Sequence, residues 1–211
     1  MPRRPKYTKE ELIDTAVAII REEGEEFLSV RNLVKRLGTA PATIVTHFPS
    51  MDALEKALTD KIRAIYDTYV DRGLSKNPPF KGFAIEYVMF SIKEPNLYNY
   101  LFLRQKDTKT LRDLIEEEGH KERLTQEAMR VFGCSKQVAE EVFENLVIFM
   151  FGLASMCSKG LCSFTAEELA AKFGLAAGGF LYAVKENNPW YSVVPGKDNV
   201  RVEDSPYISK D

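Results

Sequence analysis

The stretch Leu28–Leu54, LSVRNLVKRLGTAPATIVTHFPSMDAL, predicts two short helices joined by a tight turn and followed by the start of a third. Ser29 is a helix-capping residue, and apolar residues follow it at the spacing of one helix face. Gly38 suits the left-handed position that ends the first helix, and Pro41 is tolerated in the first turn of the second. Two short helices around a glycine-containing turn are typical of a helix-turn-helix, whose second helix enters the DNA major groove. The alternative is a solvated helical hairpin.

Positive charge is concentrated at this stretch and at the N-terminus. Residues 28–51 contain three cations and no acidic residue, and residues 1–9 contain four cations and no acidic residue. The whole chain has a net charge of −2. Binding to phosphates requires a local positive surface rather than a basic chain, so the charge balance is compatible with DNA as a partner.

The run Thr8–Leu58 resembles the DNA-binding domain of the TetR (tetracycline-repressor) family of bacterial transcriptional regulators. The matching residues are Ala16 and Ile20 before Gly24, Ser29-Val30-Arg31, Lys35, Gly38, Thr43-Ile44, His47-Phe48-Pro49-Ser50 and Ala53-Leu54. The resemblance implies a homodimeric, ligand-responsive regulator in the cytoplasm, most often a repressor, that binds a double-stranded DNA operator. We expect no enzymatic activity and no cofactor, because the sequence contains no catalytic set, phosphate-binding glycine loop or metal cluster.

The helix-turn-helix supplies the predicted DNA-binding residues. The surface that reads the base edges is expected to comprise Thr39, Ala40, Pro41, Thr43, Val45, Thr46 and His47. The residues expected to hold phosphates are Ser29, Arg31, Lys35 and the N-terminal arm Arg3, Arg4 and Lys6.

Three positions depart from the pattern of the family. TetR-like proteins usually carry Tyr in place of Val45, a long polar residue in place of Thr46, and Lys in place of Met51. In the family the Tyr and Lys generally contact phosphates, so their absence should lower the DNA affinity and the salt dependence. Either the basic N-terminal arm compensates for the loss, or DNA binding is weaker than is usual in the family. The alternative function is therefore a helical small-molecule-binding protein of the same fold whose DNA binding is weakened or lost.

The rest of the chain is also expected to be helical, so the predicted fold class is all-α. We expect a three-helix DNA-binding domain at residues 1–60, a helical ligand-binding and dimerisation domain at residues 61–186, and a tail at residues 187–211. A long helix from Ser50 to about Arg72 crosses the first boundary. No functional role is assigned to the tail.

The second domain is rich in aromatic and sulfur-containing residues at helical spacing. Those that the resemblance assigns to a ligand pocket are Tyr66, Tyr87, Met89, Phe90, Tyr98, Phe102, Phe149, Met150 and Met156. Each is alternatively an ordinary core residue. Few charges lie among them, which indicates a small apolar or aromatic effector.

The last two predicted helices are the candidate dimer interface. They are apolar or small on nearly every face, which favours a partner that covers the second face, although an intramolecular core is the alternative. Their glycines indicate close backbone approach, because glycine destabilises a helix interior by about 1 kcal/mol relative to alanine. The predicted interface comprises Leu146, Phe149, Gly152, Leu153, Ala170, Phe173, Gly174, Ala177 and Gly178.

Motifs for other chemistries are not found. The three cysteines form no metal-binding motif and are interpreted as buried thiols, and the two histidines belong to no catalytic set. No apolar run is expected to reach the length of a membrane span, and the N-terminus has no apolar signal region. We therefore expect no membrane partner.

Overall fold

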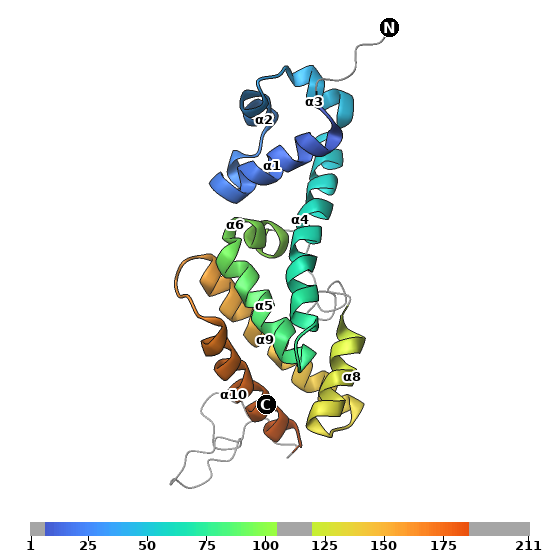
Figure 1. Cartoon of the computed structure of the whole chain (residues 1–211), viewed down its shortest axis with the longest axis vertical. Coiled ribbons are helices and arrows are strands. Elements are labelled where there is room, and N and C mark those ends of the chain that lie inside the picture. The colour runs from blue at the N-terminus through green and yellow to red at the C-terminus, as the bar shows by residue number, and fades with distance from the viewer. Residues whose placement is uncertain (1–6, 105–119, 186–211) are drawn as a thin grey trace, which may run out of the picture.

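The computed structural model describes residues 7–104 and 120–185, which fold into helices joined by short turns (Figure 1). The predicted all-α class is confirmed. The predictions for the arm Arg3, Arg4 and Lys6 and for the tail 187–211 lie outside the described residues. Figure 1 shows α1, α2 and α3 at one end of an elongated molecule, with α4 running from them to the opposite end.

Helix caps define the N-terminal elements where the sequence predicts them. The Thr8 hydroxyl accepts from the Glu11 N–H at 3.1 Å, and the Glu11 carboxylate accepts from the Thr8 N–H at 2.7 Å. Ser29 and Ser50 each cap the helix that follows them. The elements are α1 (Lys9–Glu23), a 3₁₀ turn (Glu25–Phe27), α2 (Val30–Leu37), α3 (Pro41–His47) and α4 (Met51–Leu74).

The helix α4 contributes to both halves of the molecule. Lys61 Nζ lies 2.8 Å from Asp14 Oδ1 in α1, and this hydrogen bond raises the pKa of Lys61. Further along α4, the ring of Tyr66 packs against Tyr87 and Phe90, with centroids 6.0 and 5.3 Å apart. The first contact is made by residue 61 itself, where the sequence places the domain boundary, and the second lies beyond it. The boundary itself stays a prediction.

The second half is a layered arrangement of helices around α5 and α9 (Figure 1). A capping box begins the last helix: the Glu168 N–H donates to the Thr165 hydroxyl at 3.2 Å, and the Glu168 carboxylate accepts from the Thr165 N–H at 2.8 Å. The elements are α5 (Pro79–Lys93), α6 (Pro95–Tyr98), a π-helical turn (Asn99–Leu103), α8 (Lys121–Phe132), α9 (Lys136–Ser158) and α10 (Ala166–Lys185).

The helices α4 and α5 cross with their backbones in direct contact at Gly73 and Gly82. A Cβ built on Gly73 would lie 2.7 Å from the carbonyl oxygen of Gly82, and a Cβ on Gly82 would overlap the Gly73 carbonyl in turn. A side chain at either position would force the helices apart, so both glycines are required by the packing.

One expectation about α9 is wrong. The helix α9 has 23 residues and contains an 18-residue stretch with a mean hydropathy of 1.4, so it is long and apolar enough to cross a membrane, although the sequence was expected to contain no such run. In the fold α9 packs against α5, α8 and α10 and contributes core residues such as Val142 and Ala154. This central position accounts for the buried part of its apolar surface.

Candidate DNA-binding site and ligand cavity

The turn between α2 and α3 has the geometry that the sequence predicts. Gly38 adopts φ 59° and ψ 44°, the left-handed conformation, and the Thr39 N–H donates to the Val34 carbonyl at 3.1 Å. Leu33 of α2 and Ile44 of α3 are buried in the core together with residues of α1 and α4. This packing fixes the angle between α2 and α3 and determines which face of α3 points outward.

The outward face of α3 consists of small and apolar side chains. Pro41, Ala42, Val45 and Thr46 are exposed, and Val45 is 62% exposed. Sequence reasoning missed Ala42, although its spacing of three residues before Val45 places it on the same face. This surface offers methyl groups and few charged groups, which suits contact with thymine methyls in a major groove.

The polar side chains of α3 and of the turn before it make hydrogen bonds within the local structure. The hydroxyls of Thr39 and Thr43 lie 2.9 Å apart, and the Thr46 hydroxyl donates to the Ala42 carbonyl at 2.8 Å. The Thr46 oxygen remains able to accept a hydrogen bond from a base. His47 Nε2 is buried and has no hydrogen-bond partner among the described residues.

The cations of α2 divide into two groups. Arg31 and Lys35 are exposed four residues apart on one face, and no described carboxylate pairs with either. Arg36 instead bonds the carboxylates of Glu22 and Glu23 at the end of α1, and the hydrogen bond to Glu22 raises its pKa. The Ser29 hydroxyl accepts from the Asn32 N–H at 3.2 Å as the cap of α2. Arg31 and Lys35 are therefore the cations of α2 that are available for phosphates.

The residue that follows the predicted basic arm is anchored beside the turn. The Tyr7 hydroxyl donates to the carbonyl of Leu37, the last residue of α2. Lys9 Nζ lies 5.3 Å from the centre of the Phe48 ring, just beyond the end of α3. The chain thus enters the described structure at the same end of the molecule as α2 and α3 (Figure 1).

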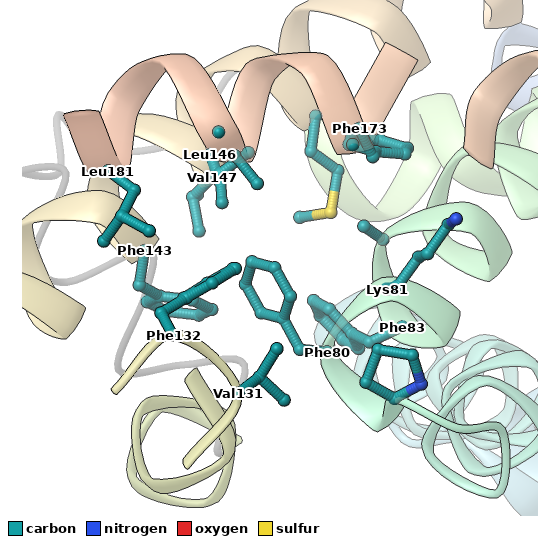
Figure 2. A pocket seen from close by; sticks show the side chains of 16 residues that line it. Phe80, Lys81, Phe83, Val131, Phe132, Phe143, Leu146, Val147, Phe173 and Leu181 are labelled. Atoms are coloured by element: carbon teal, nitrogen blue, oxygen red, sulfur yellow. The ribbon is translucent and has the colours of Figure 1, made fainter. Parts of the chain in front are cut away.

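A cavity of about 320 Å³ lies at the other end of the molecule, between the start of α5, the end of α8, and the helices α9 and α10. Figure 2 shows Phe80, Phe132 and Phe143 approaching one another from three of these helices. Among the sixteen lining residues Lys81 is the one charged side chain. Lys185 Nζ donates to the Phe132 carbonyl at 3.4 Å and so ties the end of α10 to the end of α8.

The residues assigned to a ligand pocket from the sequence occupy several different places. Tyr66, Tyr87, Phe90, Tyr98 and Phe102 pack against one another, with ring centroids 5.1 to 6.4 Å apart. These rings fill the space that they were expected to enclose. Elsewhere, Met150 lines the cavity, Phe149 packs on Phe173 at 5.8 Å, Met89 is half-buried, and Met156 is 42% exposed. Which residues contact an effector stays a prediction.

Comparison with known proteins identifies the N-terminal domain. Residues 12–58 match the family described as "Bacterial regulatory proteins, tetR family". Over these residues the chain matches the TetR family.

Solved structures share the fold over most of the chain. A protein of unknown function from Rhodococcus sp. RHA1 has a TM-score of 0.62 at 16% identity, covering 86% of this chain and 98% of its own. A TetR-like transcriptional regulator from the same organism has a TM-score of 0.57 at 14% identity, covering 88% and 100%. The fatty acid degradation regulator FadR from Bacillus halodurans has a TM-score of 0.51 at 20% identity, covering 86% and 97%. No curated protein matches the sequence.

The residues that the sequence assigns to a TetR-type dimer interface are divided between the core and the surface. Leu146, Leu153, Phe173 and Ala177 are buried within the protomer, and Phe149 and Ala170 are half-buried. The exposed members are Gly152, Gly174 and Gly178.

The exposed face of α9 and α10 carries large apolar residues that sequence reasoning did not assign to the interface. Ile148 is 55% exposed, Leu175 is 80% exposed and Tyr182 is 51% exposed. We call the exposed apolar and small residues of the two helices the outer face; they also include Met156, Gly152, Gly178 and Gly179. The spacing of 148, 152 and 156 was visible in the sequence, but helices that are apolar all round give no sign of which stripe faces inward.

Polar contacts connect the two halves of the protein. Arg21 Nε of α1 lies 2.8 Å from Glu94 Oε2, and the Asn96 amide donates to the Arg21 carbonyl at 3.0 Å. Arg104 follows the π-helical turn and contacts both Glu25, at 2.6 Å, and Glu55, at 3.0 Å. The segment 94–104 is therefore bonded to α1, the 3₁₀ turn and α4 at once.

The described part of the chain offers no arrangement for metal chemistry. Across residues 7–104 and 120–185, no group of three or more His, Cys, Asp or Glu side chains is placed to hold a metal ion. The sites that the described residues do provide are an exposed helix-turn-helix and an apolar cavity.

Proposed function

We propose that this TetR-family protein is a cytoplasmic transcriptional repressor that binds a double-stranded DNA operator as a homodimer and releases it when a small apolar or aromatic effector binds. The observation that best supports this proposal is the surface of α2 and α3, where the exposed face of α3 lies beside Arg31 and Lys35. Neither cation is neutralised by a described carboxylate. Such a surface can insert a helix into the major groove while its flanks hold phosphates.

The homodimer is supported by the outer face of α9 and α10. An exposed strip that includes Leu175 and Ile148 is costly in water, and a two-fold partner would cover it with the same strip. The two α3 helices would then enter successive major grooves about 34–36 Å apart.

The apolar cavity is our candidate effector site. A volume of about 320 Å³ with aromatic and aliphatic walls fits a small apolar molecule. Its walls include α9 and α10, so an occupant would alter the helices that carry the outer face. A change in the dimer geometry would alter the distance between the two α3 helices, so that it no longer matches the spacing of successive major grooves. Binding of an effector in the cavity would in this way weaken binding of DNA.

The alternative is a small-molecule-binding protein of the same fold with weakened DNA binding. Val45 supports it, because the family usually has a phosphate-contacting Tyr there and Val45 is exposed on the reading face. The two functions share the cavity and the dimer and differ only in DNA affinity.

Fluorescence anisotropy with labelled duplexes from the region upstream of the coding sequence distinguishes them, with random duplexes of equal length as a reference. We expect preference for the upstream DNA and weaker binding as salt increases. Arg31→Ala and Lys35→Ala should each weaken binding and reduce the salt slope by about 1. Arg36→Ala is the matched control on the same helix, because Arg36 is already paired with Glu22 and Glu23. Wild-type affinity in both test variants would show that the surface is misassigned, and no binding to any duplex at low salt would favour the alternative function.

A further inference from the structure

Two cysteines meet where α9 ends. Cys157 lies in the last turn of α9 and is 6% exposed, whereas Cys162 lies in the loop that leads to α10 and is half-buried. Their Sγ atoms are 3.8 Å apart. Gly160, with φ 69°, reverses the chain between them. The sequence reasoning treated the cysteines as separate buried thiols, so this proximity is a finding of the fold.

The distance between the two sulfurs is short enough for a small shift of the loop to close it. A disulfide requires the two sulfurs at about 2.05 Å. Cys157 is held by the helix, but the loop around Cys162 is open to solvent, since Leu161 is 76% exposed and Lys159, Gly160 and Ser163 are also exposed. Because the sulfurs are now 3.8 Å apart, a shift of the loop by about 2 Å or less would bring them to bonding distance.

The pair borders a second cavity, of about 460 Å³, which gives a small oxidant access to the thiols. Its lining residues are Ile92, Pro95, Cys157, Ser158, Gly160, Cys162 and Ser163. The cavity therefore connects the thiol pair to the corner between α5 and α6.

We propose that Cys157 and Cys162 are an oxidation site at which a hydroperoxide converts the two thiols to an intramolecular disulfide. The thiolate of Cys162 attacks the peroxide, the O–O bond breaks, and Cys162 becomes a sulfenic acid while water or an alcohol leaves. The sulfur of Cys157 then displaces hydroxide from the sulfenic acid, and its proton completes a water molecule. Two thiols are oxidised, one peroxide is reduced, and no other reactant is needed.

The order of the two steps follows from the environments of the sulfurs. Burial, together with the contact to Cys162, raises the pKa of Cys157 to about 12, so Cys157 is a thiol near neutral pH. Cys162 is the more accessible of the two and reacts first. Closure by Cys157 should be slow at neutral pH and faster in alkaline solution.

The oxidation site lies close to the contacts that join the two halves of the molecule. Pro95 lines the second cavity, and its neighbours Glu94 and Asn96 both bond Arg21 of α1. A disulfide that moves the loop against Pro95 would disturb these bonds. Oxidation should therefore change DNA affinity, a consequence that rests on the proposed function.

The disulfide is tested by treating the reduced, full-length protein with hydrogen peroxide and mapping its peptides by mass spectrometry under non-reducing conditions. We expect a peptide linking residues 157 and 162, with the loss of two hydrogen atoms, in the wild type and in the control variant Cys134→Ser. Cys157→Ser should instead accumulate a sulfenic acid at Cys162 that dimedone traps. Oxidation confined to Cys134, or overoxidation of Cys162 without the linked peptide, would overturn the proposal.

DNA anisotropy on the same samples tests the coupling separately. The oxidised wild type should differ from the reduced protein by roughly fivefold or more in Kd, with Cys162→Ser unaffected by peroxide. A complete disulfide with an unchanged Kd would overturn the coupling. If the reduced protein binds no DNA at all, the proposed function fails while the peptide map still decides the oxidation site.

Discussion

Substituting the glycines of the outer face by alanine tests the homodimer, because the change in stability has opposite signs with and without a partner. A Cβ built on Gly152 or Gly179 meets no atom within 4 Å in the protomer, and neither residue lines the cavity. In an isolated protomer, alanine at each site should therefore stabilise the helix by about 1 kcal/mol. Nothing within the described protomer explains why glycine is present.

A partner helix crossing at these glycines would reverse the sign. Overpacking by one methyl group costs about 1–3 kcal/mol, and a two-fold axis places each substitution in the dimer twice. The predicted loss is about 2–6 kcal/mol per dimer, which raises the dimer Kd by roughly 30-fold to 10⁴-fold. Over most of this range, the interface loss exceeds the stabilisation of about 1 kcal/mol that alanine gives each helix.

Sedimentation velocity over a dilution series, paired with thermal unfolding at high and low protein concentration, measures both terms. We expect Gly152→Ala and Gly179→Ala to dissociate at higher concentrations than the wild type. At concentrations where all proteins are monomeric, the variants should unfold at a higher temperature than the wild type. An unchanged dimer Kd with a raised unfolding temperature at every concentration would refute the assignment of the outer face as the interface.

Three further predictions concern the protomer. Gly82→Ala should lower the free energy of unfolding by about 2 kcal/mol or more in urea, independent of protein concentration, because its Cβ would overlap the Gly73 carbonyl. Arg104→Gln should lower stability by only about 1 kcal/mol, since its two ion pairs are partly exposed, but it should change the effect of ligand or oxidation on DNA affinity. Folding raises the pKa of Cys157 from the ordinary thiol value near 9 to about 12. The unfolded chain therefore loses this proton first, and the free energy of unfolding falls as the pH rises from 9 toward 12. Cys157→Ser should remove that part of the alkaline loss in chemical denaturation curves.

The features that the sequence predicted well are set by neighbouring residues. Thr8, Ser29 and Thr165 each begin a helix because a hydroxyl satisfies an N–H three residues later. Gly38 ends α2 because its backbone adopts a conformation that other residues avoid. Such signals act within one helical turn, so they can be recognised in the sequence without knowledge of the fold.

The cavity and the interface depend on tertiary packing and were not predictable in the same way. A row of aromatic residues at helical spacing is compatible with a pocket or with a filled core, and Tyr66, Phe90 and Tyr98 prove to fill their own space. The cavity forms between the start of α5, the end of α8, and the helices α9 and α10, an arrangement that no single helix encodes. The inward position of Phe173 and the outward position of Leu175 are fixed by how α10 rotates on α9.

The crossing of α4 and α5 has a mechanical consequence. Where Gly73 meets Gly82, backbone rests on backbone, so no flexible side chain can absorb a change in the crossing angle. The crossing is a fulcrum, and the length of α4 beyond it is a lever of about 33 Å that ends at Met51. A tilt of about 5° at the fulcrum displaces the far end by about 3 Å, by the geometry of a helix that rises 1.5 Å per residue. A small change in the crossing angle would therefore be amplified along α4 into a displacement, at its N-terminal end beside α3, on the scale of a base-pair step.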